Sequence, residues 1–139
     1  MCTNDTCKFE VLNKESAVAQ IYMGRLTTHV LDTANGLPGA EIPVELYKLE
    51  GNQAELLCTV YTNADGRTDK PLLADEAFKS GKYQLIFHTA DYFRQQGVTL
   101  SEQPFLDDVV IRFGINDTDE HYHVPLLVSP FSFSTYRGS

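Results

Sequence analysis

The stretch that decides the fold is residues 108–128, which read DVVIRFGINDTDEHYHVPLLV. In both halves apolar side chains recur at every second position, the pattern of strands that bury one face. In Asp108–Ile115 the apolar face consists of Val109, Ile111, Phe113 and Ile115. In His121–Val128 it consists of Tyr122, Val124, Leu126 and Val128. The stretch therefore predicts two strands, each with one face against a hydrophobic core.

Outward from this stretch, short apolar segments are separated by turn-forming sequences such as Asn35–Gly39 and Asn63–Gly66. They predict further strands near residues 25–33, 42–49, 56–62, 70–73, 82–89 and 133–137. One short helix is predicted at Ala90–Gln96, because Gly97 suits the residue that follows a helix end. The pattern indicates an all-β sandwich. Residues 1–22 are polar and lack a clean period, so we expect an N-terminal extension before a domain at 23–139.

Composition limits the classes of function. The 139 residues fit one domain, and the net charge of −8, without a run of Lys and Arg, argues against nucleic-acid binding. No segment is long and apolar enough to predict a membrane span. The three cysteines, Cys2, Cys7 and Cys58, form no disulfide pattern, which favours a reducing compartment and hence the cytoplasm.

Alternation in the strand at 121–128 places two histidines away from the core. If Tyr122 and Val124 face inward, His121 and His123 share the opposite face with Pro125, about 6.5–7 Å apart along the strand. Two imidazoles on one face are typical of acid–base chemistry near neutral pH. A pair of solvated surface histidines would give the same pattern, and the strand alone does not separate the two interpretations.

Other candidate residues are weaker when taken singly. His29 alternates with core positions of its strand, and Arg67 follows the Asp65-Gly66 turn, but an exposed or structural role explains either one. Three histidines could also supply a zinc site, although no carboxylates are spaced to orient such ligands. His88 is interpreted as structural or exposed. The Gly-x-Ser-x-Gly motif of many serine hydrolases is absent from the sequence.

Four motifs carry a resemblance to a known family. They are LTTHVLD at 26–32, DGR at 65–67, HYHVPLL at 121–127 and YRGS at 136–139. In this order they resemble the 5-hydroxyisourate hydrolases, the transthyretin-related enzymes of urate breakdown. The resemblance covers roughly residues 24–139. It implies a transthyretin-like (prealbumin-like) sandwich of two four-stranded sheets, and a homotetramer in which two subunits together form each site.

The resemblance also implies an activity and its residues. A cyclic amide is hydrolysed without metal or cofactor, and 5-hydroxyisourate becomes 2-oxo-4-hydroxy-4-carboxy-5-ureidoimidazoline. By this resemblance His29, Arg67 and His123 are catalytic. The substrate is bound by His29 and Arg67 together with the tail residues Tyr136, Arg137, Gly138 and Ser139. His123, helped by His29, would deprotonate the attacking water, and His121 is a weaker candidate.

Two other functions stay open beside the hydrolase. A carrier of the same fold would bind an aromatic hormone in an apolar channel without reaction, whereas histidines and an arginine favour chemistry. A zinc hydrolase is the second alternative, and metal analysis with chelator treatment would separate it. The cytoplasm is the predicted compartment, and the peroxisome is the alternative that the urate pathway suggests.

Overall fold

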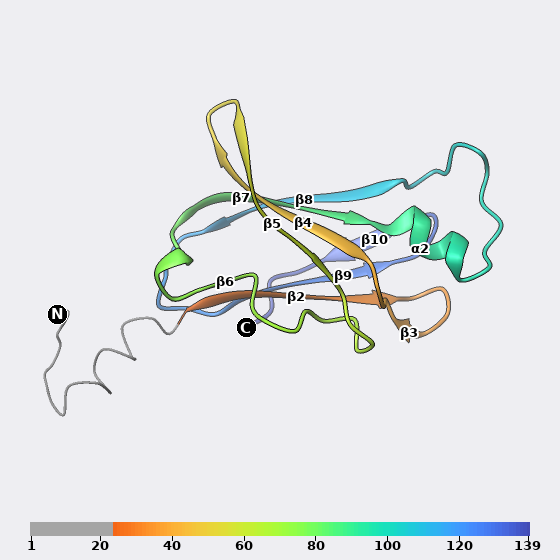
Figure 1. Cartoon of the computed structure of the whole chain (residues 1–139), viewed down its shortest axis with the longest axis horizontal. Coiled ribbons are helices and arrows are strands. Elements are labelled where there is room, and N and C mark those ends of the chain that lie inside the picture. Colours follow the sequence, from red (N-terminus) through yellow and green to blue (C-terminus); the bar gives the residue numbers. More distant parts are fainter. Residues whose placement is uncertain (1–23) are drawn as a thin grey trace, which may run out of the picture.

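The computed structural model describes residues 24–139 and shows two β-sheets joined face to face (Figure 1). One sheet has the strand order β5-β4-β7-β8, formed by Gln53–Tyr61, Pro43–Glu50, Gly81–His88 and Asp108–Ile115. The other has the order β10-β9-β2-β3, formed by Phe133–Thr135, Tyr122–Val128, Arg25–Asp32 and Leu37–Pro38, with β6, Leu73–Ala74, also paired to β2. The helix α2, Thr89–Gln95, follows β7.

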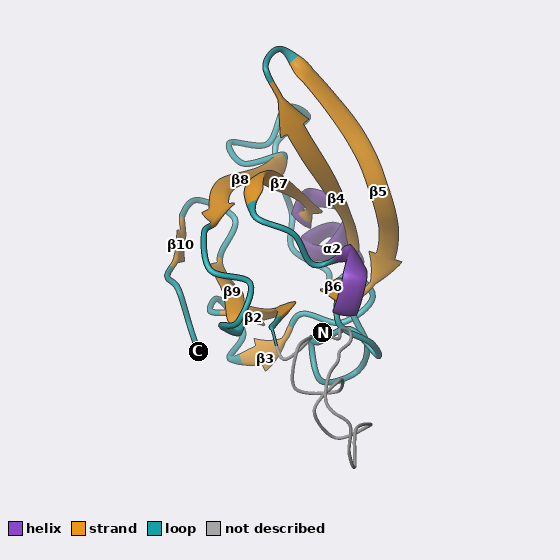
Figure 2. Cartoon of the chain, turned by 90° about the vertical axis from the view of Figure 1, so that its left-hand side faces the viewer, coloured by secondary structure: helices purple, strands orange, loops and turns teal. Residues whose placement is uncertain are grey.

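The core lies between the two sheets, which Figure 2 shows as upper and lower layers viewed roughly along the strands. It is built from inward-facing side chains of both sheets, and the largest fully buried ones include Tyr83, Phe87, Leu46, Leu26 and Leu126. Each strand alternates because successive side chains point to opposite faces. In β2 the burial follows this period, with Leu26, Thr28 and Val30 buried and Thr27 and His29 only half-buried.

The pairing of β2 with β9 is parallel, unlike the antiparallel pairings of the remaining strands. Thr27 is in register with His123, and His29 with Pro125. The buried Thr28 hydroxyl donates to the Val124 carbonyl at 2.6 Å and adds a bond across the same pair. This register brings the histidines of two distant segments onto one outer face of the sheet.

A buried carboxylate ties the helix to the end of β2. Asp32 is fully buried and accepts hydrogen bonds from the Tyr92 hydroxyl at 2.8 Å and from the amides of Ala34 and Asn35, each at 3.0 Å. Burial of the phenol and its bond to Asp32 both raise the pKa of Tyr92. Because a buried charge needs several donors, this cluster fixes the position of α2 against the sheet.

The predicted sandwich is confirmed, and the differences lie at strand ends and at short elements. β5 begins at Gln53 and not at residue 56, and β9 begins at Tyr122, so His121 lies just outside the strand predicted for it. The predicted strands at 70–73 and 133–137 are observed as Leu73–Ala74 and Phe133–Thr135. The sequence predicted Asp108–Ile115 with its bounds as observed, and the helix within one residue, with Gly97 following it at φ +86°. The segment Asn35–Gly39 was predicted as a turn only, but it contains β3, so this sheet has five strands and not four. A 3-10 turn at Asp75–Ala77 was not predicted either. The predicted extension at 1–22, with Cys2 and Cys7, lies outside the described residues.

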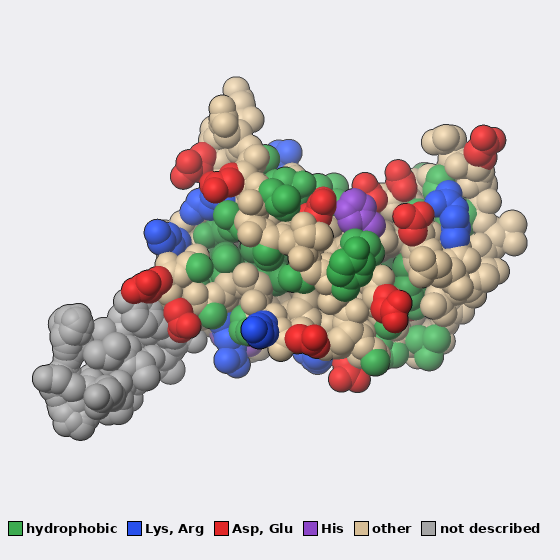
Figure 3. All heavy atoms as spheres, in the orientation of Figure 1, with side chains coloured by type: hydrophobic (Ala, Val, Ile, Leu, Met, Phe, Trp, Pro, Cys, Tyr) green, Lys and Arg blue, Asp and Glu red, His purple; other side chains and the backbone are tan. Residues whose placement is uncertain are grey.

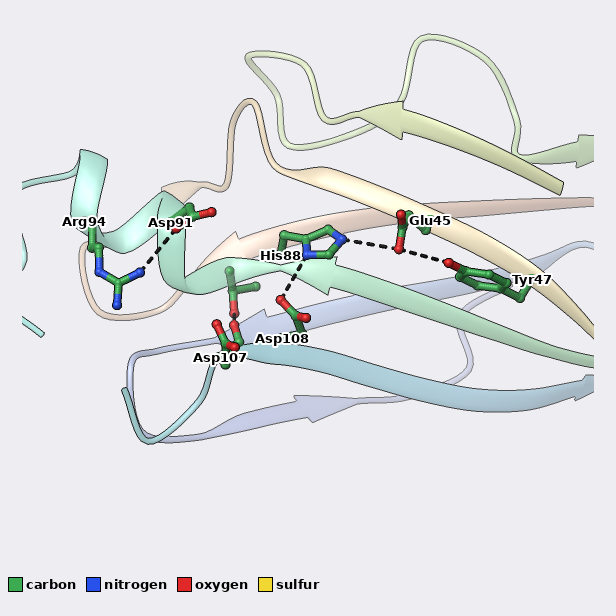
Figure 4. Close-up of polar contacts among 8 residues, drawn as sticks. Glu45, Tyr47, His88, Asp91, Arg94, Asp107 and Asp108 are labelled. Carbon is green, nitrogen blue, oxygen red and sulfur yellow. Dashed lines mark hydrogen bonds and ion pairs between the residues drawn. The ribbon is translucent and has the colours of Figure 1, made fainter. Parts of the chain in front are cut away.

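The surface seen in Figure 3 carries acidic side chains spread over the face, as the net charge of −8 requires. On the sheet remote from the β2–β9 pair, His88 lies between two carboxylates (Figure 4). Its Nδ1 is 2.9 Å from Asp108 Oδ1, and its Nε2 is 3.3 Å from Glu45 Oε1. His88 thus links three neighbouring strands, which agrees with the first of the two roles, structural or exposed, that the sequence left open for it. Among residues 24–139, no helix is long and apolar enough to cross a membrane.

Candidate active site

Three imidazoles and one hydroxyl form a continuous hydrogen-bonded chain on the outer face of the β2–β9 pair. His29 Nδ1 lies 2.7 Å from His123 Nε2, and their rings stack with centroids 4.9 Å apart. His123 Nδ1 lies 2.7 Å from Thr27 Oγ1, which in turn is 2.9 Å from His121 Nε2. Both ring nitrogens of His123 are therefore engaged. His29 Nε2 forms no hydrogen bond with the residues that the structure describes, so it is available to a substrate or water.

Arg67 is brought to His29 by a tight loop. Asn63 organises this loop, since its side-chain oxygen accepts from the Asp65 and Arg67 amides at 2.9 and 3.2 Å. Gly66 has φ +75°, and a Cβ there would lie 2.5 Å from the Val30 carbonyl oxygen, so only glycine fits against β2. A backbone bridge then pairs Arg67 with His29. The exposed Arg67 side chain makes no ion pair within residues 24–139, and its charge stays available to an anion.

The C-terminal tail closes the other side of the site. Gly138 forms an isolated bridge with His123, in which the Gly138 amide donates to the His123 carbonyl at 2.7 Å. The Arg137 guanidinium lies 4.0 Å from the Tyr122 ring centre and donates to Glu120 at 2.9 Å. These contacts hold the tail against β9, and Gly138 allows its backbone to approach His123 closely.

Strands β2 and β9, the Arg67 loop and the C-terminal tail line an open cleft of about 850 Å³. Its lining includes every predicted site residue, namely His29, Arg67, His123, Tyr136, Arg137, Gly138 and Ser139. His121 lines it as well, and so do Arg25 and Lys70. Four cationic side chains around one cleft, with Asp69 as the acidic side chain in its lining, favour an anionic ligand.

The electrostatic environment keeps the histidines neutral. Burial and, secondarily, the Arg67 charge lower the pKa of His29. Burial, His29, Arg67 and His121 lower the pKa of His123 to about 4. Burial, Arg25 and Arg137 lower the pKa of His121. At neutral pH each imidazole thus keeps one nitrogen lone pair, so the hydrogen-bonded histidines are able to accept a proton.

The donor geometry suits proton transfer better than zinc binding. Two nitrogens bound to one tetrahedral zinc at about 2.0–2.1 Å lie roughly 3.3 Å apart and both point at the metal. Here His29 Nδ1 and His123 Nε2 face each other at 2.7 Å. Within residues 24–139 there is no group of three or more His, Cys, Asp or Glu arranged to hold a metal ion.

The structure brings the predicted residues together and adds some that the sequence did not reveal. Thr27, Arg25 and Lys70 were not singled out, because threonine and exposed cations are common on strands and loops. Thr27 had one detectable signal, since it shares the period-two face of His29.

The fold and the site define a class: a sandwich of two sheets that carries a histidine and arginine site on the outer face of one sheet. The chain belongs to the HIUase/Transthyretin family, whose model matches residues 26–138.

The named relatives and solved structures include a hydrolase, a synthase and a transthyretin in complex with thyroxine. The chain is 62% identical to the 5-hydroxyisourate hydrolase of Pseudomonas aeruginosa, over 84% of this chain and 93% of that protein. It superimposes on the crystal structure of an (S)-allantoin synthase with a TM-score of 0.80 and 49% identity, covering 84% of this chain but 44% of that one. It also superimposes on sea bream transthyretin in complex with thyroxine with a TM-score of 0.73 and 27% identity, covering 82% and 94%.

Proposed function

We propose that this protein hydrolyses 5-hydroxyisourate to 2-oxo-4-hydroxy-4-carboxy-5-ureidoimidazoline, the ring-opening step of urate breakdown. The observation that carries the proposal is that, among residues 24–139, His29 Nε2 and the neighbouring Arg67 charge have no partner, in a cleft lined by cations. The name of the Pseudomonas aeruginosa relative, 62% identical over 84% of this chain, supports the same activity.

The reaction begins with a water molecule between His29 and the substrate. His29 Nε2 takes a proton from this water as its oxygen adds to a ring amide carbonyl. The tetrahedral intermediate carries a negative charge on the former carbonyl oxygen, and Arg67 stabilises this charge as a fixed planar cation. The carbon–nitrogen bond of the ring then breaks, and His29 returns the proton to the leaving nitrogen. The product is a carboxylic acid, which releases its remaining proton to solvent at neutral pH and becomes a carboxylate.

The division of roles between the histidines differs from the sequence-based expectation, in which His123 acted on the water. His123 uses one nitrogen toward His29 and the other toward Thr27, and neither faces the cleft without a partner. We therefore assign the water-facing role to His29, with His123 behind it as the group that accepts the His29 Nδ1 proton. Arg67→Ala and His123→Ala should each lower the rate about 10²- to 10⁴-fold.

The tail residues complete the site in this proposal. Tyr136, Gly138 and Ser139 form one wall of the cleft, and Arg137 holds that wall through Glu120 and Tyr122. The cleft opens on the exposed face of the sheet, so a second copy laid on that face would close it. We propose that four copies assemble in this way, and sedimentation velocity of the wild-type protein checks the tetramer. The cytoplasm stays our prediction for the compartment.

A carrier function is the second candidate, because the chain shares 27% identity and its fold with sea bream transthyretin in complex with thyroxine. The lining of the cleft disfavours the carrier function. An apolar aromatic ligand would displace the water that hydrates three histidines and several cations without replacing its hydrogen bonds. Titration with thyroxine, followed by fluorescence, separates the two functions. Tight thyroxine binding without hydrolysis would favour the carrier.

The direct test uses freshly generated 5-hydroxyisourate. Its ultraviolet absorbance is followed with and without the wild-type protein, and the product is identified by NMR and mass spectrometry as the substrate plus one water. We expect decay far above the spontaneous rate and unaffected by a metal chelator. Loss of activity with the chelator, restored by zinc, would instead support a metal-dependent hydrolase.

A further inference from the structure

Thr27 occupies a position in the site that the proposed reaction does not yet use. Its hydroxyl oxygen contacts two imidazoles at once, His123 of β9 at 2.7 Å and His121, the residue just before β9, at 2.9 Å. Beyond His123 the chain continues to His29 at 2.7 Å. Four groups, from β2, β9 and the residue just before β9, thus form one unbroken row of hydrogen bonds from His29 to His121.

Counting hydrogens restricts how this row is arranged. The hydroxyl has a single hydrogen, so at least one of the two nitrogens that face it must donate an N–H. His123 has a pKa of about 4, is neutral at pH 7 and carries one N–H. The tautomers of His29 and His123 are therefore coupled, and a His123 that accepts from the Thr27 hydroxyl requires His121 to donate to it.

One arrangement leaves His29 ready to act as a base. Here His29 Nδ1 donates to His123 Nε2, His123 Nδ1 donates to Thr27, and the Thr27 hydroxyl donates to His121 Nε2. His29 Nε2 then carries a lone pair. In the opposite arrangement every hydrogen bond is reversed, and His29 Nε2 carries a hydrogen.

We infer that Thr27 and His121 extend the site into a proton relay, in which the positive charge formed at His29 is moved along β2 and β9 to His121. The inference rests on the proposed hydrolysis. As His29 Nε2 takes the water proton, His29 Nδ1–H passes to His123 Nε2, and His123 Nδ1–H passes to the Thr27 oxygen. The Thr27 hydrogen then passes to His121 Nε2, and His121 becomes the imidazolium. The same shifts run in reverse when His29 protonates the leaving nitrogen, so no proton is gained or lost.

The charges around the row favour this direction of transfer. A cation on His29 or His123 would lie beside Arg67, which has no ion-pair partner within residues 24–139. Around His121 the positive groups are Arg25 and Arg137, and the Arg137 guanidinium is paired with Glu120 at 2.9 Å. Moving the charge to His121 also takes it away from His29, beside which Arg67 must act on the developing oxyanion. Thr27 and His121 are thus positioning residues that act through His123 and His29.

Three variants at matched positions test the role of the Thr27 hydroxyl. Thr27→Val keeps the branched shape suited to a strand but removes the hydroxyl, and Thr27→Ser restores it. Thr33→Val makes the same change just after β2, where the hydroxyl contacts only the Val128 carbonyl. We expect Thr27→Val to lower kcat about 10- to 100-fold with KM unchanged, Thr27→Ser to recover most of it, and Thr33→Val to match wild type. Unchanged kcat in Thr27→Val, or no recovery in Thr27→Ser, would overturn the relay.

A second variant separates proton transfer from mere positioning. The amide of His121→Gln reaches Thr27 from the same side as Nε2 but cannot become a cation. The relay predicts a drop in kcat of about 10-fold or more, with KM retained. In mixtures of light and heavy water, wild type should show more than one transferring proton, whereas Thr27→Val and His121→Gln show one. Wild-type kcat in His121→Gln, or the same isotope dependence in all three proteins, would contradict the inference.

A measurement without substrate distinguishes failure of the relay from failure of the proposed function. Ring-nitrogen NMR of the wild-type protein should show the His123 nitrogen shifts changing as His121 titrates, and Thr27→Val should abolish this coupling. If the protein does not hydrolyse 5-hydroxyisourate but the coupling is present, the proposed substrate is wrong and the hydrogen-bonded row stands. If hydrolysis is observed and the coupling is absent, the relay is wrong.

Discussion

Replacing Gly138 by alanine should slow hydrolysis while leaving the fold intact, because the tail backbone lies directly against His123. A Cβ at this position would be 3.1 Å from His123 Cδ2 and 3.2 Å from His123 Cβ, short of the 3.4 Å at which ordinary contact begins. The imidazole must therefore move by about 0.3 Å. It holds His29 and Thr27 at 2.7 Å on either side, so it cannot move without lengthening one of these bonds.

The expected effect follows from this displacement. A misplacement of about 1 Å in a catalytic group costs roughly 10²-fold in rate, so 0.3 Å corresponds to about four-fold on a logarithmic scale. We expect kcat of Gly138→Ala to fall about three- to ten-fold, with KM within about two-fold of wild type. Stability should change little, since Gly138 is outside the left-handed region of backbone conformation. The assay is the ultraviolet decay of 5-hydroxyisourate, together with a denaturant midpoint.

Gly51→Ala supplies the matched control. Gly51 has φ +59° at the tip of the β4–β5 hairpin, and a Cβ there would meet nothing within 4 Å. An alanine in this conformation costs about 1 kcal/mol of stability but lies away from the cleft. Gly138→Ala should therefore lower kcat and keep wild-type stability, whereas Gly51→Ala should lower stability and keep wild-type kcat. Wild-type kcat in Gly138→Ala would refute the argument that the tail positions His123.

Three further outcomes are expected. Because the pKa values of His29, His121 and His123 are all lowered from 6.5, that of His123 to about 4, the neutral, basic forms persist as pH falls below 6.5, and the decline of kcat/KM should have its midpoint below 6.5; a midpoint at or above 6.5 in a stopped-flow profile would contradict this. Residues added after Ser139 should reduce activity more than the same residues added before Met1, because Ser139 lines the cleft, and equal activities would remove the tail from the site. Tyr92→Phe should lower the free energy of unfolding by about 1.5–3 kcal/mol, because Asp32 loses a buried donor, and kcat should be unchanged; an unaltered urea midpoint would show that the bond contributes nothing.

Most of the sandwich could be predicted from the sequence because its long strands bury one face. The period-two pattern of Val109, Ile111 and Ile115 is a direct consequence of that burial, and it placed β8 correctly. The two-residue β3 could not be predicted, since Leu37 and Pro38 are too few to show a period and lie within turn-forming residues. Pro125 was expected on the outward face of its strand, and nothing in the sequence indicated that it is buried there. Its carbonyl accepts a hydrogen bond from the Thr135 hydroxyl of the adjoining strand β10.

The candidate site was predicted in part, for a related reason. Alternation placed His29 and His123 on outward faces, but it does not say that β2 and β9 are neighbours. Their parallel register, with Thr27 opposite His123, is set by the tertiary structure between strands far apart in the sequence. The sequence therefore indicated the imidazoles and placed Thr27 on the face of His29, but not that the Thr27 hydroxyl joins two of the imidazoles, nor which nitrogen stays open.

The most direct test of the account compares one substitution inside the cleft with the same substitution outside it. His29→Gln and His88→Gln each replace an imidazole on a strand, but His88 lies on the other sheet, between Glu45 and Asp108. We predict that wild type and His88→Gln accelerate 5-hydroxyisourate decay equally, and that His29→Gln is slower by about 10²- to 10⁴-fold. Equal rates in the two variants, or a wild-type rate no faster than spontaneous decay, would contradict the account.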